Sequence, residues 1–104
     1  MMSDFNYERD VKNAGKPVLI DFYATWCGPC KVLSKKLDQF EKDYEEQIKV
    51  IRLNIVKHSE FAMNNNVRGV PSLLLYREGR FVDQYIGDLT MQQLEEFTGV
   101  NVGN

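Results

Sequence analysis

The stretch Trp26-Cys27-Gly28-Pro29-Cys30 organises the rest of this chain and holds both of its cysteines. An apolar run over residues 18–24 ends just before it, and apolar residues at helical spacing follow it. The stretch is therefore predicted to be the turn from a buried strand into a helix. Two intervening residues put Cys27 at the open N-terminus of that helix and Cys30 one turn later.

A thiol at a helix N-terminus is expected to ionise readily. Unpaired backbone N–H groups and the positive end of the helix dipole stabilise an anion there, which lowers the pKa of the Cys27 thiol. Pro29 suits the first helical turn because its missing N–H would have no partner there in any case. Gly28 lets the backbone of a partner come close. Together these residues predict a reactive dithiol.

Three other roles for the cysteines stay open on this evidence. A structural disulfide would close a very short loop and remove little entropy from the unfolded chain, on the order of 2 kcal/mol. A zinc site needs four ligands, and beyond the cysteines only His58 is an obvious soft candidate. Two reduced, inert thiols are the third role, although inert thiols usually lie in apolar runs rather than beside Trp, Gly and Pro.

Two motifs in order carry a family resemblance: residues 18–31, and residues 68–76, which contain Val70-Pro71-Ser72. With Gly87 before the last helix, the chain resembles the thioredoxin family over nearly its whole length. The resemblance implies an α/β thioredoxin fold, with a mixed central sheet of four to five strands flanked by helices on both faces. Residues 1–104 are expected to form a single thioredoxin domain, whose usual first strand is short or missing.

Length and composition agree with one compact domain and limit the classes of partner. The chain has 104 residues, of which 43% are apolar, enough for one hydrophobic core. A formal charge of -2 with scattered lysines and arginines indicates neither nucleic acid nor a membrane as partner. The N-terminus lacks the basic flank and apolar run of a signal peptide, so a cytoplasmic location is expected. In that reducing compartment a Cys-X-X-Cys pair is more often redox-active than structural.

Asp21 interrupts the otherwise apolar run 18–24. Burial in a central strand is expected to raise the pKa of its carboxyl group, unless backbone hydrogen bonds at a strand end hold the carboxylate. The resemblance implies a role for it, because thioredoxins place a buried aspartate behind the second cysteine as a proton relay. Arg52 stands where many thioredoxins have a lysine near this aspartate. Its guanidinium either reaches Asp21 and lowers that pKa or turns out into solvent.

The resemblance also implies a surface for binding client proteins. In the family, the proline that matches Pro71 follows a cis peptide bond and packs against the active-site disulfide, and Val70 would offer its backbone to a client chain as an added strand. Gly87 matches the glycine that borders this groove, and its other reading is a plain turn. The resulting small, apolar surface suits many extended clients. Its members are Trp26, Gly28, Pro29, Val70, Pro71 and Gly87.

Local patterns predict the remaining elements. A short helix is expected within residues 3–13, a helix over 30–44, a strand over 49–55, and a hairpin of strands 72–76 and 80–86. Helices that connect the early strands imply that those strands pair in parallel.

Three sets of capping residues mark helix ends. Ser59 is expected to cap a short helix, with His58 exposed in the loop before it. Thr90 and Gln93 form a capping-box pattern for a last helix, and Gly99 is expected to end it.

The resemblance implies dithiol–disulfide exchange, in which Cys27 attacks a client disulfide and Cys30 resolves the mixed disulfide. Cys30 is expected to be the more buried thiol with the higher pKa, and Asp21 to accept its proton. The protein would then be a monomeric protein-disulfide reductase in electron transport and cell redox homeostasis. It would use no metal or other cofactor, only its redox-active disulfide, with electrons from a thioredoxin reductase.

Two other functions stay open. Thioredoxin-like domains can also serve as binding or adaptor modules that use the same apolar surface without catalysis. A second alternative is an oxidising or isomerising exchange protein outside the cytosol. The Gly28-Pro29 pair argues against that second alternative, because it resembles the reducing members of the family.

Overall fold

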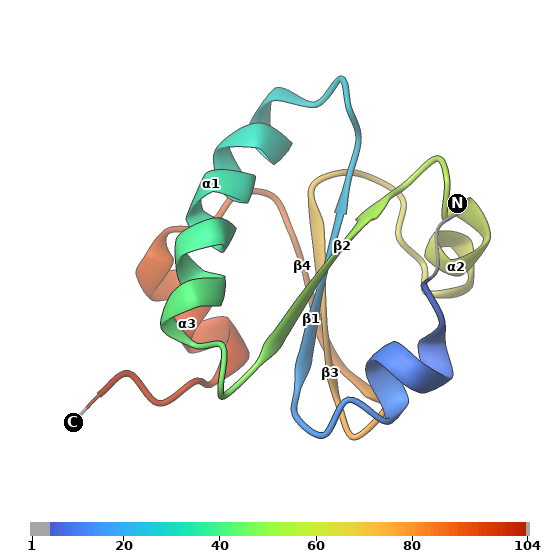
Figure 1. The fold of residues 1–104 in the computed structure, drawn as a ribbon. Coiled ribbons are helices and arrows are strands. Elements are labelled where there is room, and N and C mark those ends of the chain that lie inside the picture. Colours follow the sequence, from blue (N-terminus) through green and yellow to red (C-terminus); the bar gives the residue numbers. More distant parts are fainter. Residues whose placement is uncertain (1–4, 104) are drawn as a thin grey trace.

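The computed structural model describes residues 5–103, which form a four-stranded sheet with helices on both faces (Figure 1). The order of elements is the one that the sequence predicts. The elements are the π-helix η1 (Glu8–Lys12), β1 (Val18–Tyr23), α1 (Gly28–Asp43), β2 (Lys49–Asn54), α2 (Ser59–Asn64), β3 (Ser72–Arg77), β4 (Arg80–Ile86) and α3 (Met91–Thr98). No strand precedes β1 within residues 5–103. The expectation of a short or missing first strand also concerns residues 1–4, which lie outside this range.

The sheet has the strand order β2-β1-β3-β4 and mixes both kinds of pairing. β1 and β2 are parallel, as their connection through α1 requires, whereas β3 pairs antiparallel with both β1 and β4. The register places Asp21 of β1 beside Arg52 of β2 and opposite Leu73 of β3. Because parallel strands end at the same edge of a sheet, the two cysteines that follow β1 lie near the loop that follows β2.

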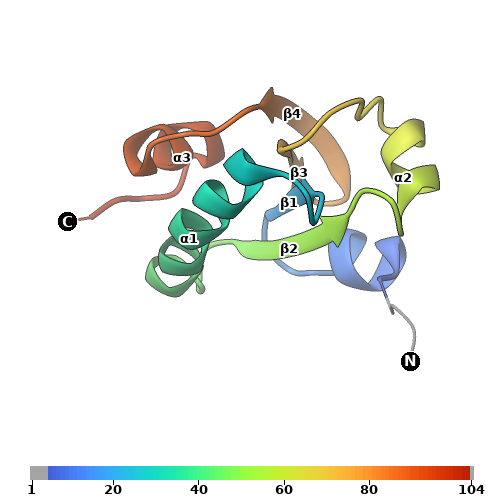
Figure 2. The ribbon, with the colours of Figure 1, turned by 90° about the horizontal axis from the view of Figure 1, so that it is seen from above.

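Each face of the sheet has its own hydrophobic core. Figures 1 and 2 show α1 and α3 on one face and η1 and α2 on the other. Strand β1 supplies both cores, with Leu19 toward α1 and Ile20 and Phe22 toward η1 and α2. Burial on both faces explains why residues 18–24 read as a continuous apolar run.

Local signals at the hairpin and the last helix are confirmed. Glu78 and Gly79 have φ angles of 54° and 79°, the left-handed conformation of a two-residue hairpin turn. The Thr90 side chain accepts the Gln93 N–H, and the Gln93 side chain accepts the Thr90 N–H, so the capping box is complete. Gly99 ends α3 with a φ of 74°.

The prediction for the start of α2 is wrong. Ser59 is the first residue of the helix, and His58 is the N-cap, without a capping bond from its side chain. His58 is also half-buried rather than exposed, since its ring meets that of Phe5 edge to face with centroids 5.9 Å apart. The N-terminal segment packs on α2 through this contact, which no local pattern in the sequence reveals.

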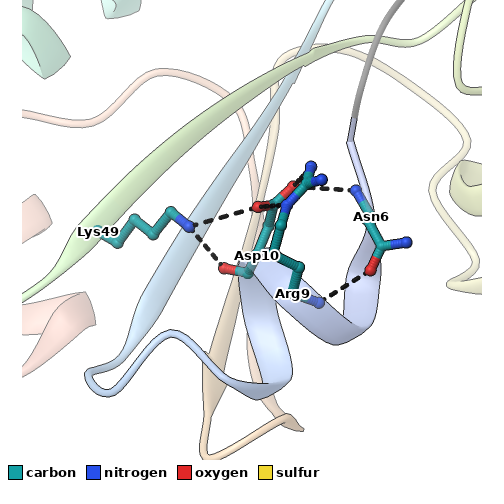
Figure 3. Close-up of polar contacts among 4 residues, drawn as sticks. All are labelled: Asn6, Arg9, Asp10 and Lys49. Carbon is teal, nitrogen blue, oxygen red and sulfur yellow. Dashed lines mark hydrogen bonds and ion pairs between the residues drawn. The ribbon is translucent and has the colours of Figure 1, made fainter.

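A polar cluster centred on Asp10 ties η1 to β2 (Figure 3). The Asp10 carboxylate accepts a hydrogen bond from Arg9 Nε at 2.7 Å and one from the Asn6 backbone N–H at 2.9 Å. Lys49 Nζ donates to the Asp10 carbonyl at 3.0 Å and lies 3.8 Å from Asp10 Oδ1. These partners, the Arg9 hydrogen bond above all, hold the pKa of Asp10 well below its usual range. We call these four residues the Asp10 cluster.

Candidate functional site

The two cysteines form a disulfide at the N-terminus of α1, with Cα atoms 5.3 Å apart. Cys27 is the N-cap residue, and its Sγ accepts the backbone N–H of Cys30 at 3.1 Å. Pro29 lies in the first turn of the helix, as predicted. Both the hydrogen bond and the helix N-terminus favour negative charge on the Cys27 sulfur once the disulfide is reduced.

The expected difference in burial between the cysteines is not observed, because Cys27 and Cys30 are 5% and 3% exposed. Both pack against Ala24, with Val70 beside them. The cysteines differ instead in what they face. Cys30 lines a cavity, partly open to solvent, that Asp21 also lines, and Cys27 is not among the residues lining it. Only Cys30 therefore shares a cavity with a titratable carboxyl group.

The second motif meets the disulfide in space, as the resemblance implies. The Val70–Pro71 peptide bond is cis, and Val70 packs against the two cysteines and Ala24. The backbone N–H of Gly87 donates to the Pro71 carbonyl at 2.9 Å. This hydrogen bond joins the segment before β3 to the end of β4, and the φ of Gly87, 117°, lies in the region that favours glycine.

The remaining predicted members of the surface flank the disulfide along the chain. Trp26 is 73% exposed, and Gly28 and Pro29 are exposed as well. A large aromatic side chain left in water beside a buried disulfide is available for contact with another protein. The residues predicted to bind clients thus come from residues 26–29, which flank the disulfide, and from Val70, which packs against it, with Pro71 next in the chain and Gly87 bonded to Pro71.

A cavity of about 430 Å³ adjoins Cys30. Asp21 lines it from the middle of β1, so the alternative of a carboxylate held at a strand end is wrong. The residue is 1% exposed, and its Oδ1 has no hydrogen-bond partner within residues 5–103. Burial raises the pKa of Asp21 to about 6, and the positive charge of Arg52 opposes the rise. The other lining residues are Tyr23, Ala24, Thr25, Lys31, Ser34 and Arg52.

Arg52 lowers the pKa of Asp21 through its charge, as expected of a nearby guanidinium, but its end groups turn to two exposed carboxylates. Its Nη2 donates to Asp38 at 2.9 Å and its Nη1 to Glu41 at 3.2 Å, both on α1. In the described part of the chain, no hydrogen bond joins Arg52 to Asp21. Sequence reasoning missed Asp38 and Glu41. Their i,i+3 spacing puts them on one side of a helix, but which strand that side faces depends on how α1 crosses the sheet.

Other kinds of site find no support in residues 5–103. The structure has no cluster of three or more His, Cys, Asp or Glu side chains in this range that could hold a metal ion. The zinc alternative for Cys27 and Cys30 therefore has no ligand set here. None of the helices in the same range is long and apolar enough to cross a membrane.

Comparisons with known proteins agree with this geometry. The thioredoxin family model matches residues 1–99. A thioredoxin from Pseudomonas aeruginosa is 38% identical over 101 residues, which cover 97% of this chain and 94% of that protein. A thioredoxin from Acidithiobacillus ferridurans is 36% identical over 96 residues, 92% of this chain and 89% of that protein.

A solved structure is similar as well. A mutant thioredoxin from Halobacterium salinarum superimposes with a TM-score of 0.78 at 31% identity, over 85% of this chain and 76% of that one. Family model, relatives and fold agree, and the Cys27–Cys30 disulfide lies where the family's chemistry requires it. The chain therefore belongs to the thioredoxin family and is a thiol–disulfide oxidoreductase of the protein-disulfide reductase type.

Proposed function

We propose that Cys27 is the nucleophile and Cys30 the resolving thiol of this reductase. The Cys27 thiolate attacks one sulfur of a client disulfide, and the other client sulfur leaves as a thiolate. Cys30 then gives up its proton, and its thiolate attacks Cys27 Sγ and releases the second client sulfur. The client gains two electrons, and the Cys27–Cys30 pair becomes a disulfide. The observation that carries these roles is the Cys27 sulfur at the N-cap of α1.

Asp21 is the proposed acceptor of the Cys30 proton. Both residues line the same cavity, and Asp21 belongs to the strand that leads into the cysteine turn. With a pKa of about 6, its carboxyl group is mostly ionised at pH 7 and is still basic enough to take a proton. A carboxylate on the surface, with an ordinary pKa, would be a weaker base.

Clients bind across the disulfide on a small apolar surface. Val70 supplies backbone for an added strand, and the cis Pro71 shapes the floor of the groove. Trp26 is the large exposed side chain beside it. Backbone pairing does not depend on the side chains of the client, so the surface is expected to accept many client sequences rather than one. Its other members are Gly28, Pro29 and Gly87.

The electrons come from a thioredoxin reductase, and the redox-active disulfide is the only redox group the cycle needs. The protein works as a monomer of one domain, residues 1–104, in the cytoplasm, where it carries electrons to client proteins and maintains redox homeostasis. A formal charge of -2 without clustered cations supports protein clients rather than nucleic acid or a membrane surface.

A trapping experiment tests the two cysteine roles. Cys30→Ser leaves the attacking thiol but removes the resolving one, so client proteins are expected to accumulate as covalent complexes that a reductant releases. Non-reducing electrophoresis of the variant, mixed with a protein of known disulfide content, measures the complex. Cys27→Ser is the matched control and should trap nothing. Equal trapping by the two variants would show that the roles are assigned wrongly.

A further inference from the structure

Arg52 and Asp21 share a feature that no other described side chain has. Asp21 Oδ1 and Arg52 Nε are the two buried side-chain polar atoms within residues 5–103 that lack a hydrogen-bond partner. The two residues are neighbours in the β1–β2 register and line the same cavity. An unpaired donor thus lies near an unpaired acceptor, and the rest of the guanidinium is bound elsewhere.

Two carboxylates on α1 hold that guanidinium. Arg52 Nη2 lies 2.9 Å from Asp38 Oδ1, and Nη1 lies 3.2 Å from Glu41 Oε1. The Arg52 side chain is 27% exposed, against 70% for Asp38 and 43% for Glu41. These ion pairs therefore lie at the exposed edge of the sheet, where α1 meets β2, and Arg52 also lines the cavity. We call these three residues the Arg52 clamp.

We propose that Asp38 and Glu41 are positioning residues for the thiol–disulfide exchange, because they fix how much of the Arg52 charge reaches Asp21. The inference rests on the proposed role of Asp21 as proton acceptor. In the clamp, two negative charges offset the guanidinium, and its Nη1 and Nη2 groups bond to Glu41 and Asp38 rather than to the Asp21 carboxylate. Asp21 then stays unpaired and basic enough to accept the Cys30 proton.

Few other charged or titratable groups lie around Asp21. The Arg52 clamp is therefore expected to have the main electrostatic influence on its protonation. Cys30 and Lys31 face the cavity from α1, and Tyr23 faces it from β1. Opposite Asp21, β3 contributes the apolar Leu73. An arginine freed from the clamp would act on Asp21 with a charge that two carboxylates no longer offset, and Asp21 itself is buried, which strengthens the attraction.

The test measures protonation of Asp21 directly, in the full-length oxidised protein labelled with ¹³C. The chemical shift of the Asp21 carboxyl carbon is followed against pH in the parent and in the double variant Asp38→Asn/Glu41→Gln. Both changes keep the side-chain volume at exposed sites. We expect the midpoint to fall by about half a pH unit or more, because the cation is no longer offset. Arg52→Gln should move the midpoint the other way by a similar amount, because the cation is gone.

A combined variant shows whether Asp38 and Glu41 influence the protonation of Asp21 through Arg52 or directly. In the triple variant with Arg52→Gln, the downward shift should disappear, and the midpoint should match that of Arg52→Gln alone. Asp43→Asn is the control on the same helix, where the carboxylate bonds Gln39 instead, and should leave the midpoint unchanged. An unchanged midpoint in the double variant, or the same downward shift in the triple variant, would overturn the proposal.

The rate at which a mixed disulfide is resolved distinguishes a wrong clamp proposal from a wrong role for Asp21. If Asp21→Asn does not slow the resolution of a mixed disulfide, Asp21 is not the proton acceptor, and the proposal falls with that role whatever the midpoints. If Asp21→Asn slows resolution and the midpoints stay fixed, the function stands and only the clamp is wrong. Shifted midpoints together with a slowed Asp21→Asn variant support both.

Discussion

Two aspartates lie near cations of β2 on opposite faces of the sheet, and the pKa values of their carboxyl groups shift in opposite directions. Asp10 accepts hydrogen bonds from Arg9 and the Asn6 backbone, lies near Lys49, and has a lowered pKa. Asp21 is buried beside Arg52 without a bond to it and has a pKa raised to about 6. A nearby cation is therefore not enough to set the direction. Two differences decide the direction: Asp21 is buried far more deeply than Asp10, and only Asp10 receives direct hydrogen bonds that offset its desolvation.

The comparison separates stability from function. The Asp10 carboxylate stabilises the fold wherever it is ionised, because its charge is satisfied. The Asp21 carboxylate destabilises the fold when it is ionised, since little offsets its desolvation. Asp21 lines the same cavity as Cys30, where the proposed mechanism needs a base. The two sites should therefore respond to pH with opposite signs.

The largest effect is expected from Asp21→Asn. A raised folded-state pKa means that the carboxyl group favours the fold at low pH and that this contribution is lost as pH rises through about 6. The variant should therefore gain stability over the parent by about 2 kcal/mol between pH 4 and pH 7.5. Urea unfolding at both pH values measures the gain. A stability difference that does not change with pH would mean that Asp21 has an ordinary pKa.

The same variant should lose activity while it gains stability. Because the variant removes the proposed proton acceptor, we expect the mixed disulfide to be resolved at least about tenfold more slowly at pH 7. Trp26 fluorescence in a single turnover with a client disulfide gives the rate. Asp83→Asn, on exposed β4, is the control and should leave both rate and stability near those of the parent.

A smaller effect of opposite sign is expected from Asp10→Asn. A lowered folded-state pKa means that the carboxylate stabilises the fold above about pH 4, its unfolded range, and that the contribution is lost as pH falls through the folded pKa. The variant should be less stable than the parent by about 1 kcal/mol at pH 7, and the difference should shrink toward pH 2. Urea titrations at both pH values measure this. If the variant were as stable as the parent at pH 7, the Asp10 carboxylate would not stabilise the fold, and the contrast with Asp21 would be wrong.

The smallest effect is expected from Lys49→Met, which keeps the aliphatic stem and removes the ammonium. Lys49 Nζ bonds the Asp10 carbonyl at 3.0 Å, but it lies 3.8 Å from the carboxylate and is partly exposed. We expect a loss of about 0.5 kcal/mol or less, most of it absent in 0.5 M salt because exposed charges are screened. A loss larger than that of Asp10→Asn would make Lys49, and not Arg9, the main partner in the Asp10 cluster.

Much of the architecture was predictable because its signals are local. The alternation of apolar runs and helical spacing predicted every element from η1 to α3, and the capping box at Thr90 and the turn at Glu78-Gly79 followed from residue type alone. The cis bond before Pro71 was predicted from family resemblance rather than from physics, since most X-Pro bonds are trans.

What the sequence could not supply depends on how distant elements cross. The partners of Arg52 follow from the angle of α1 over β2, and the half-buried state of His58 from the packing of Phe5 on α2. The sequence pattern also does not predict that η1 is a π-helix, in which the Asn13 N–H donates to the Glu8 carbonyl. These are contacts between segments, and a pattern within one segment does not encode them.

The hydrogen bond between the Cys30 amide and the Cys27 sulfur makes one backbone proton a reporter of the whole cycle. A sulfur accepts most strongly as a thiolate and more weakly once it is bonded to another sulfur. The amide resonance of Cys30 should therefore differ among the reduced, mixed-disulfide and oxidised forms. A single nitrogen-labelled spectrum would then count the three populations during turnover, with no label on the client.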